Sequence, residues 1–305
     1  MRLFARPQPR TQMRLAGQPR DTARPLAVMH IPKTSGMALI GGLTAALRPR
    51  QLLSGFDLCL FGGFDRFDTI APDVRSHIHV TPAQVPQGAD VIAAHMACST
   101  LQAAYPAAQM MTFLREPRCR LLSHYVYWRA QTPDALSPWG AWAQVSLSAR
   151  ERLEVFLQRA GIAAQTDNLS LRMLLWPHPA IPRDGFIAER DDAMLVEQAL
   201  ARLDGFSFLE IIERPGLTEA LSAWCGAAVT YAVVNETPHV PDAARTLLEQ
   251  EFTPAAFDAL HRRTRLDAAL WTALAARHMA EPAAAQLAAA AFARGVARFA
   301  RLLAP

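Results

Sequence analysis

The sequence predicts an α/β protein with three α/β/α layers, a central parallel sheet and a helical C-terminal part. Short apolar runs are followed by a turn and a helical pattern, which is typical of βα units in a parallel sheet. Residues 241–303 are rich in alanine and helical in pattern. No repeat or linker divides the 305 residues, so we expect one α/β domain with helical insertions.

The expected elements follow the chain in order. Apolar runs bounded by turn residues predict strands at residues 26–31, 77–80, 90–94, Gln109–Leu114 and 206–212. A helix is expected at residues 37–47, and a long helical stretch at about 117–175 with a break at 132–138. In the C-terminal part, Glu281-Pro282 predicts an interruption, because proline cannot continue a helix.

The basic residues are concentrated at the N-terminus. Six arginines and one acid, Asp21, occur in the first 24 residues. Without these 24 residues the chain is close to neutral, so its net charge of +4 does not indicate a nucleic-acid partner. This segment contains prolines but no apolar block of the length found in a signal peptide or membrane anchor. Residues 1–25 are therefore predicted to be a disordered basic tail, and residues 26–305 a single domain.

The cysteines and histidines suggest neither a disulfide framework nor a metal site. Four cysteines occur singly among apolar residues, at positions 59, 98, 119 and 225, which favours a reducing cytoplasm. His77 and His79 are a possible pair of metal ligands, but no third ligand is spaced to complete the site.

The first chemical motif surrounds Lys33, the only lysine in the chain. An apolar strand runs into the turn Pro32-Lys33-Thr34-Ser35-Gly36, and a helix follows. Backbone N–H groups, hydroxyls and an ammonium would then surround a helix N-terminus, which is a favourable site for a phosphate-like anion. The structural alternative is an ordinary βα turn with Thr34 or Ser35 as N-cap. The glycines of a Walker A loop are absent, which disfavours a conventional ATP or GTP loop.

The second motif begins where the strand Gln109–Leu114 ends. Arg115 follows the strand, Pro117 suits the first turn of a helix, and Ser123 lies about two turns further on. The guanidinium and the hydroxyl could hold a second phosphate together, because arginine offers a fork of donors to its oxygens. Alternatively, Arg115 pairs with Glu116 and Ser123 is only packed.

Together the motifs resemble the two phosphate loops of sulfotransferases that use 3′-phosphoadenosine 5′-phosphosulfate (PAPS). The resemblance is to the carbohydrate branch, which includes heparan sulfate 2-O-sulfotransferases and bacterial relatives. The family patterns I-P-K-T-[GS]-[GS] and L-R-[DE]-P-x-x-R-x-x-S-x-[YF] correspond to residues 31–36 and 114–125. The resemblance implies a P-loop NTPase-like sulfotransferase fold. It also implies sulfuryl transfer from PAPS, without a metal, to a hydroxyl of a carbohydrate or glycolipid-like acceptor.

The resemblance also assigns roles to residues. Lys33, Thr34, Ser35 and Gly36 would bind the 5′ side of the donor, with Lys33 taking up charge on the leaving phosphate, and Arg115 and Ser123 would bind its 3′-phosphate. Segments 94–96, 167–172, 208–214 and 266–271 are similar to further family segments at lower specificity. The resemblance covers about residues 26–278, so the tail and the last helix lie outside it.

An acceptor hydroxyl needs a general base, and imidazole has a pKa near neutral pH. His95 follows the strand at residues 90–94, at the edge where open parallel sheets bind ligands, and the family places a catalytic histidine there. His95 is therefore the predicted base for in-line transfer. A histidine that only caps the strand is the structural alternative, and His30 remains the second candidate for the base.

Other residues allow weaker predictions about the acceptor. Residues 131–145 and 176–192 are expected to shape its pocket. The arginines at 262, 263 and 265 could attract an anionic acceptor, although a solvated helix face is the simpler interpretation. His124, Tyr125, Tyr127 and Trp128 form an aromatic helix face that stacks on a ligand or belongs to the core. The alternative functions are a P-loop-type small-molecule kinase and a non-catalytic nucleotide-binding protein of the same fold.

Overall fold

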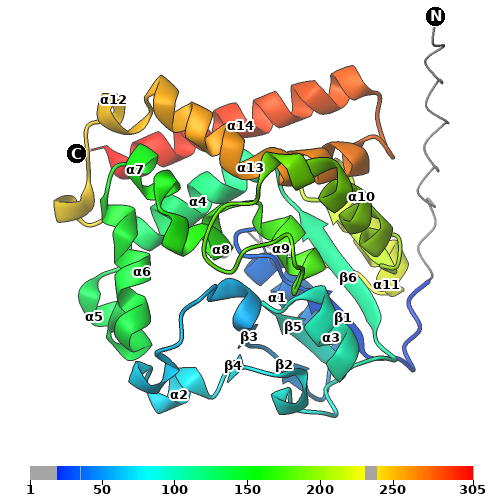
Figure 1. Cartoon of the computed structure of the whole chain (residues 1–305). Coiled ribbons are helices and arrows are strands. Elements are labelled where there is room, and N and C mark those ends of the chain that lie inside the picture. Colours follow the sequence, from blue (N-terminus) through cyan, green and yellow to red (C-terminus); the bar gives the residue numbers. More distant parts are fainter. Residues whose placement is uncertain (1–18, 35, 231–238, 305) are drawn as a thin grey trace, which may run out of the picture.

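The computed structural model describes residues 19–34, 36–230 and 239–304. Its central sheet has five parallel strands in the order β2-β5-β1-β6-β7. The strands are β1 (Leu26–Met29), β2 (Leu52–Leu53), β5 (Val91–Ala94), β6 (Gln109–Leu114) and β7 (Phe208–Ile211). The first strand is central, and the chain places β5 on one side of it and β6 on the other (Figure 1). Such a change of direction creates a crevice at the carboxyl ends of the strands.

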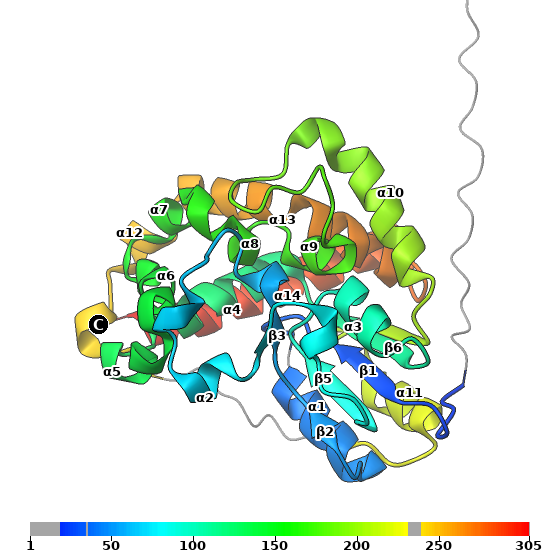
Figure 2. The same cartoon turned by 60° about the horizontal axis from the view of Figure 1, so that its bottom comes forward.

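Both faces of the sheet are buried, because successive strand residues point to opposite faces and nearly all are apolar. Helices α1 (Gly36–Leu47) and α11 (Leu217–Cys225) cover one face, and Leu39, Leu43 and Leu221 pack there. The other face packs against α3 (Cys98–Ala104), α9 (Leu169–Leu175), α10 (Asp192–Leu203) and α13 (Pro254–Ala275). Figure 2 shows the two helical layers on either side of the strands. The predicted three-layer α/β/α arrangement is therefore confirmed.

A second apolar core lies among α4 (Pro117–Arg129), α7 (Leu153–Gln158), α13 and α14 (Glu281–Leu303). Helix α4 starts just after the carboxyl end of β6 and leads away from the sheet, and α14 packs along it (Figure 1). This position places one side of α4 over the strand ends. The short helices are α2 (Pro72–Arg75), α5 (Pro133–Leu136), α6 (Ala143–Leu147), α8 (Ala163–Thr166) and α12 (Leu248–Glu251).

Eight 3₁₀ helices complete the assigned helices of the described chain. They are η1 (Leu58–Leu60), η2 (Phe67–Thr69), η3 (Pro82–Gln84), η4 (Ser137–Trp142), η5 (Ser148–Arg150), η6 (Ala160–Ile162), η7 (Glu189–Asp191) and η8 (Asp242–Ala244).

The strand predictions are mostly confirmed, with one error of placement. Strand β6 has the predicted bounds, whereas β1, β5 and β7 are shorter than predicted. The strand predicted at residues 77–80 is β4 (Ile78–His79), and it pairs with β3 (Phe56–Asp57) in a separate two-stranded sheet. The edge strand β2 was not predicted, since two residues give no periodicity.

One of the helical predictions needs a correction. The stretch predicted at 117–175 is helical but divided into many short pieces, and α5 occupies the predicted break. The predicted interruption of the C-terminal helical part is confirmed: α13 ends at Ala275 and α14 begins at Glu281. Pro282 lies in the first turn of α14, where its missing N–H costs nothing.

The predicted tail has an ordered end. Residues 1–18 lie outside the described residues, but Arg24 Nε donates to Ala107 O (2.7 Å) and Gln109 Nε2 donates to Pro19 O (2.8 Å). The segment from Pro19 onwards is thus fixed at the start of β6. The predicted boundary between tail and domain, at residues 25 and 26, is therefore too late in the chain.

Candidate active site

The loop after β1 is bent at Lys33, which has a backbone φ of 70°. This left-handed conformation costs a residue other than glycine roughly 1–2 kcal/mol. The Thr34 hydroxyl donates to Ile31 O (2.8 Å), and α1 begins at Gly36. Thr34 therefore has its backbone N–H, rather than its hydroxyl, to offer an anion. Ser35, the remaining predicted residue of this loop, lies outside the described residues.

The Lys33 ammonium lies against an aromatic ring and has no acidic partner. Its Nζ is 4.0 Å from the centroid of the Tyr127 ring on α4. No carboxylate among the described residues forms an ion pair with it. Burial, together with the positive charges of Arg115 and Arg298, lowers the pKa of Lys33 to about 8. An anion bound here would stabilise the ammonium and raise that pKa.

Arg115 joins the two predicted motifs through a backbone contact. Its Nη1 donates to the Lys33 carbonyl oxygen (2.9 Å), and its Nη2 donates to Cys119 Sγ (3.0 Å). Arg115 does not form the alternative pair with Glu116, because that carboxylate accepts from Cys119 N (2.8 Å) and pairs with Arg118 (2.6 Å). Arg115 thus fixes the Lys33 loop to the end of β6.

Helix α4 presents a polar stripe, Arg120, Ser123, His124 and Tyr127, to this loop. The spacing i, i+3, i+4, i+7 places the four side chains on one helix face, and the contact between Tyr127 and Lys33 shows where that face points. Ser123 is buried, and its hydroxyl has no hydrogen-bond partner in the described ranges. Sequence reasoning placed Ser123 here and assigned His124 to an aromatic helix face, but it missed Arg120. The sequence signal that could have identified Arg120 is a charged residue one turn before a histidine, on a helix whose other residues are mostly apolar.

His95 continues the line of β5 and is held by its backbone on both sides. His95 N donates to Gly55 O (2.9 Å), Asp57 N donates to His95 O (3.3 Å), and Phe56 forms a β-bridge with it. The neighbouring Asp57 carboxylate accepts from Ala97 N (2.8 Å) at the start of α3. The short β3–β4 sheet therefore fixes the backbone of His95.

The side chain of His95 has one nitrogen engaged. Its Nδ1 lies 2.6 Å from His30 O, and since a carbonyl can only accept, Nδ1 carries the proton. In the neutral ring Nε2 is then the proton acceptor. Burial is the main cause that lowers the His95 pKa to about 4, and the Lys33 charge adds to it. His95 is thus a neutral base at pH 7, and the His30 carbonyl orients it.

A series of rings leads from His95 towards the surface. The His95 ring lies 4.2 Å from that of His30 and stacks on Phe56 at 5.5 Å, between centroids. Phe56 meets Trp139 edge-on at 5.6 Å. Trp139 belongs to η4 and is partly exposed. One of the two segments predicted to shape the acceptor pocket, residues 131–145, therefore reaches the histidine through Phe56.

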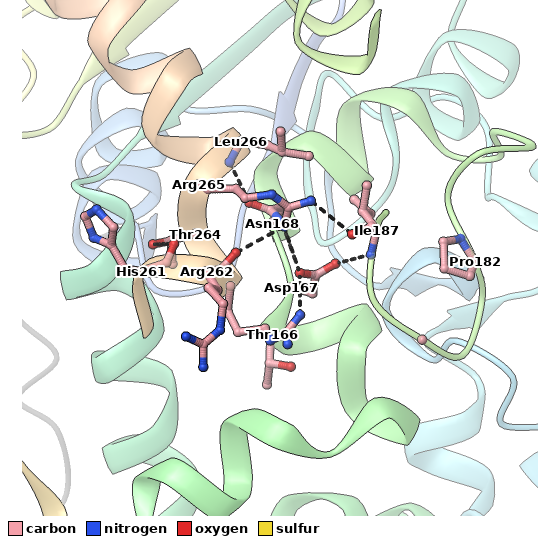
Figure 3. Close-up of polar contacts among 12 residues, drawn as sticks. Thr166, Asp167, Asn168, Pro182, Ile187, His261, Arg262, Thr264, Arg265 and Leu266 are labelled. Atoms are coloured by element: carbon pink, nitrogen blue, oxygen red, sulfur yellow. Dashed lines mark hydrogen bonds and ion pairs between the residues drawn. The ribbon is translucent and has the colours of Figure 1, made fainter. Parts of the chain in front are cut away.

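The segment at 167–172 and the arginines of α13 form a structural junction (Figure 3). Asn168 Oδ1 accepts from Leu266 N (2.8 Å), and Asp167 Oδ2 accepts from Ile187 N (2.9 Å). Arg265 Nη2 and Nε donate to the Asp192 carboxylate (2.7 and 2.8 Å). Arg263 Nη1 lies 3.5 Å from Asp167 Oδ1, whereas Arg262 is exposed. Two of the three arginines suggested for an anionic acceptor are therefore engaged within the fold.

The possible metal pair does not form a shared face. His77 is exposed and His79 is buried, and no group of three or more His, Cys, Asp or Glu side chains suited to a metal occurs in the described part of the chain. The four cysteines are buried free thiols.

The buried histidines predict acid sensitivity of the fold. Burial, followed by the charges of Arg120, Lys33 and His95, holds the His124 pKa well below its usual value. Unfolding restores a pKa near 6.5, so below about pH 6.5 the unfolded chain binds more protons and stability falls. Urea unfolding from pH 7.5 to 5 should therefore lose less free energy in His124→Phe than in the wild-type protein. Equal losses would mean that His124 is not buried and neutral.

Comparisons with known proteins add no assignment. A scan against models of protein families gives no match, and a comparison with curated protein sequences finds none of significant similarity. Within the described ranges, every helix is too short or too polar to cross a membrane.

Proposed function

We propose that this protein is a PAPS-dependent O-sulfotransferase acting on a hydroxyl of a carbohydrate or glycolipid-like acceptor. The proposal depends above all on Lys33, Arg115 and His95, which follow three adjacent parallel strands. Lys33 also contacts Tyr127 on the polar stripe of α4. Ligands of open parallel sheets bind beyond the carboxyl ends of the strands. The central first strand and the lysine turn before α1 also support a P-loop-like identity of the sheet.

The residues present fit an anionic donor. PAPS carries a 3′-phosphate and a 5′-phosphosulfate, so its site needs cations and N–H donors and no free carboxylate beside them. Lys33 offers an ammonium without an acidic partner among the described residues, and the loop leads to the N-terminus of α1. The acids after β6 and β7 are engaged: Glu116 with Cys119 N and Arg118, and Glu213 Oε1 with Glu116 N (2.8 Å).

Each part of the transfer can then be assigned to a side chain of this protein. PAPS supplies an activated sulfuryl group, whose bond to the 5′-phosphate oxygen breaks on transfer. Lys33 would take up charge on that phosphate, and Arg115 would hold the loop in place through the Lys33 carbonyl. Nε2 of His95 would accept the proton of the acceptor hydroxyl while Nδ1–H remains bound to the His30 carbonyl. Transfer of this kind depends mainly on alignment and charge stabilisation.

A kinase of the same fold would need an acidic side chain free to hold Mg²⁺ near the phosphates. Because Glu116 and Glu213 already accept hydrogen bonds from the protein, the site favours a sulfuryl donor over ATP. A binding protein without activity would share the donor site, so only a transfer assay separates it from an enzyme.

Calorimetry with nucleotides tests the donor assignment. Adenosine 3′,5′-bisphosphate should bind far more tightly than adenosine 5′-phosphate or ATP with Mg²⁺, because Arg115 and Ser123 would bind its 3′-phosphate. Arg115→Ala should lose roughly ten- to a hundredfold of that affinity, since it removes a charged donor and frees the Lys33 loop. Equal affinity for the bisphosphate and the monophosphate would remove Arg115 and Ser123 from the donor site, and preference for ATP would favour the kinase.

A further inference from the structure

Arg120 is a buried cation without a hydrogen-bond partner among the described residues. Its side chain is 1% exposed, and Nε, Nη1 and Nη2 all lack a hydrogen-bond acceptor among the described residues. Burial lowers the pKa of Arg120 only to about 10, so the guanidinium is charged at neutral pH. His124, one turn further along α4, is 4% exposed, and both of its ring nitrogens lack a partner too. A buried, unpaired charge is costly, which makes the pair exceptional in a folded protein.

Arg172 provides the comparison within the same chain. It is also 1% exposed, but all of its nitrogens are used: Nε donates to Asp167 O (2.7 Å), Nη1 to Pro182 O (2.8 Å) and Nη2 to Asp167 Oδ2 (2.9 Å). Arg129 is similarly engaged, with Ala244 O, Ala149 O and Glu151 O. The fold therefore satisfies its structural arginines, and Arg120 stands apart from them.

The acid whose charge acts on Arg120 does not supply the missing hydrogen bond. Asp267 on α13 influences the charge of Arg120, yet its carboxylate accepts from Ser170 N (3.0 Å) and Leu171 N (2.9 Å) at the start of α9. No ion pair joins Asp267 to Arg120. Removing Arg120 would take away a nearby positive charge from Asp267, but it would leave both of these hydrogen bonds in place.

We infer that Arg120 and His124 form an oxyanion subsite on α4 that binds a phosphate or sulfate group of the ligand. Both lie on the polar stripe that faces the Lys33 loop, with Ser123 between them in sequence. The guanidinium provides the fork of donors that matches a tetrahedral oxyanion, and neutral His124 adds one N–H. The subsite needs only an oxyanion, and so it does not depend on the donor being PAPS. Within the proposed function it gives α4 a direct part in holding the donor or an anionic acceptor.

The experiment uses the full chain and the substitutions Arg120→Met, His124→Phe and the control Arg118→Met. Arg118 lies on the same helix and is paired with Glu116. Titrations with adenosine 3′,5′-bisphosphate, adenosine 5′-phosphate and inorganic sulfate are made at constant ionic strength. Arg120→Met should lose roughly ten- to a hundredfold in affinity for the tightest of these anions, and His124→Phe about two- to tenfold. Arg118→Met should bind as the wild-type protein does.

Thermal unfolding without ligand separates binding from structure. Arg120→Met should unfold much closer to the wild-type temperature than Arg172→Met does, because it breaks no hydrogen bond of the folded protein. Arg172→Met, with equal burial, should unfold on the order of 10 °C lower or fail to fold.

The outcomes distinguish this subsite from the donor proposal. If the wild-type protein binds the bisphosphate tightly and Arg120→Met binds it equally well, the subsite is refuted and the donor site stands. If the nucleotides do not bind but sulfate raises the melting temperature only when Arg120 is present, the subsite stands and the donor proposal fails. An Arg120→Met protein that is as unstable as Arg172→Met would mean a structural role and would overturn the inference.

Discussion

His95→Ala is expected to slow sulfuryl transfer by roughly 10²- to 10⁴-fold while donor binding stays nearly intact. The imidazole is oriented by the His30 carbonyl and stacked on Phe56, so Nε2 is held ready for the acceptor proton. In the proposed mechanism it would contact the acceptor rather than the nucleotide, which is why affinity for adenosine 3′,5′-bisphosphate should survive. Initial rates at saturating donor, together with calorimetry, measure both effects.

The pH profile gives the same prediction a second readout. The acid limb of kcat/KM reports the free enzyme and should lie near the His95 pKa of about 4. The limb of kcat should lie higher, because the negative donor favours the imidazolium. Both limbs should disappear in His95→Ala. The matched variant is His30→Ala, and if that variant loses the limb while His95→Ala keeps its rate, the base is His30.

Lys33→Arg is expected to reduce turnover by about 10²- to 10³-fold, the range for loss of one group that stabilises charge in the transition state. Arginine keeps the charge but replaces a compact ammonium with a broad fork on a longer stem. It should therefore retain the fold and much of the nucleotide affinity. A near-normal rate would mean that the single lysine has no special role in transfer.

Lys33→Gly should abolish turnover without destabilising the fold. Glycine adopts the φ of 70° without strain, so the free energy of unfolding should stay level or rise by about 1 kcal/mol. Arg48→Gly is the control, because Arg48 also has a positive φ (46°) but is exposed at the end of α1. It should give a similar change in stability and full activity. A large loss of stability in Lys33→Gly alone would indicate that the lysine side chain holds the loop.

The parts of the fold that could be predicted are those with a strong local pattern. Strands buried on both faces are continuous apolar runs, so the strands β1, β5, β6 and β7 of the main sheet were predicted. Strands β2 and β3 have two residues each, and β4 joins β3 rather than the main sheet through contacts far apart in the chain. No local sequence pattern indicates that β3 and β4 pair with each other.

The candidate site likewise has features that the sequence predicts and features that it does not. The turn at Lys33 and the strand end at His95 could be read from sequence, because residue type and position in a βα unit suggest anion binding and proton transfer. The left-handed φ of Lys33 could not be predicted, because lysine rarely adopts this conformation. The contact of Arg115 with a backbone carbonyl could not be predicted either. The same holds for the missing hydrogen bonds of Arg120, because the Asp267 carboxylate accepts from the first backbone N–H groups of α9 instead.

The most direct test of the central claim is a transfer assay with radiolabelled PAPS and polysaccharide and lipid extracts as acceptors. The wild-type protein should move the label into a carbohydrate-containing fraction and release adenosine 3′,5′-bisphosphate in equal amount. Lys33→Arg and His95→Ala, confirmed as folded, should move little. Intact donor after incubation with every extract, or equal transfer by the wild-type protein and both variants, would contradict the proposed sulfotransferase.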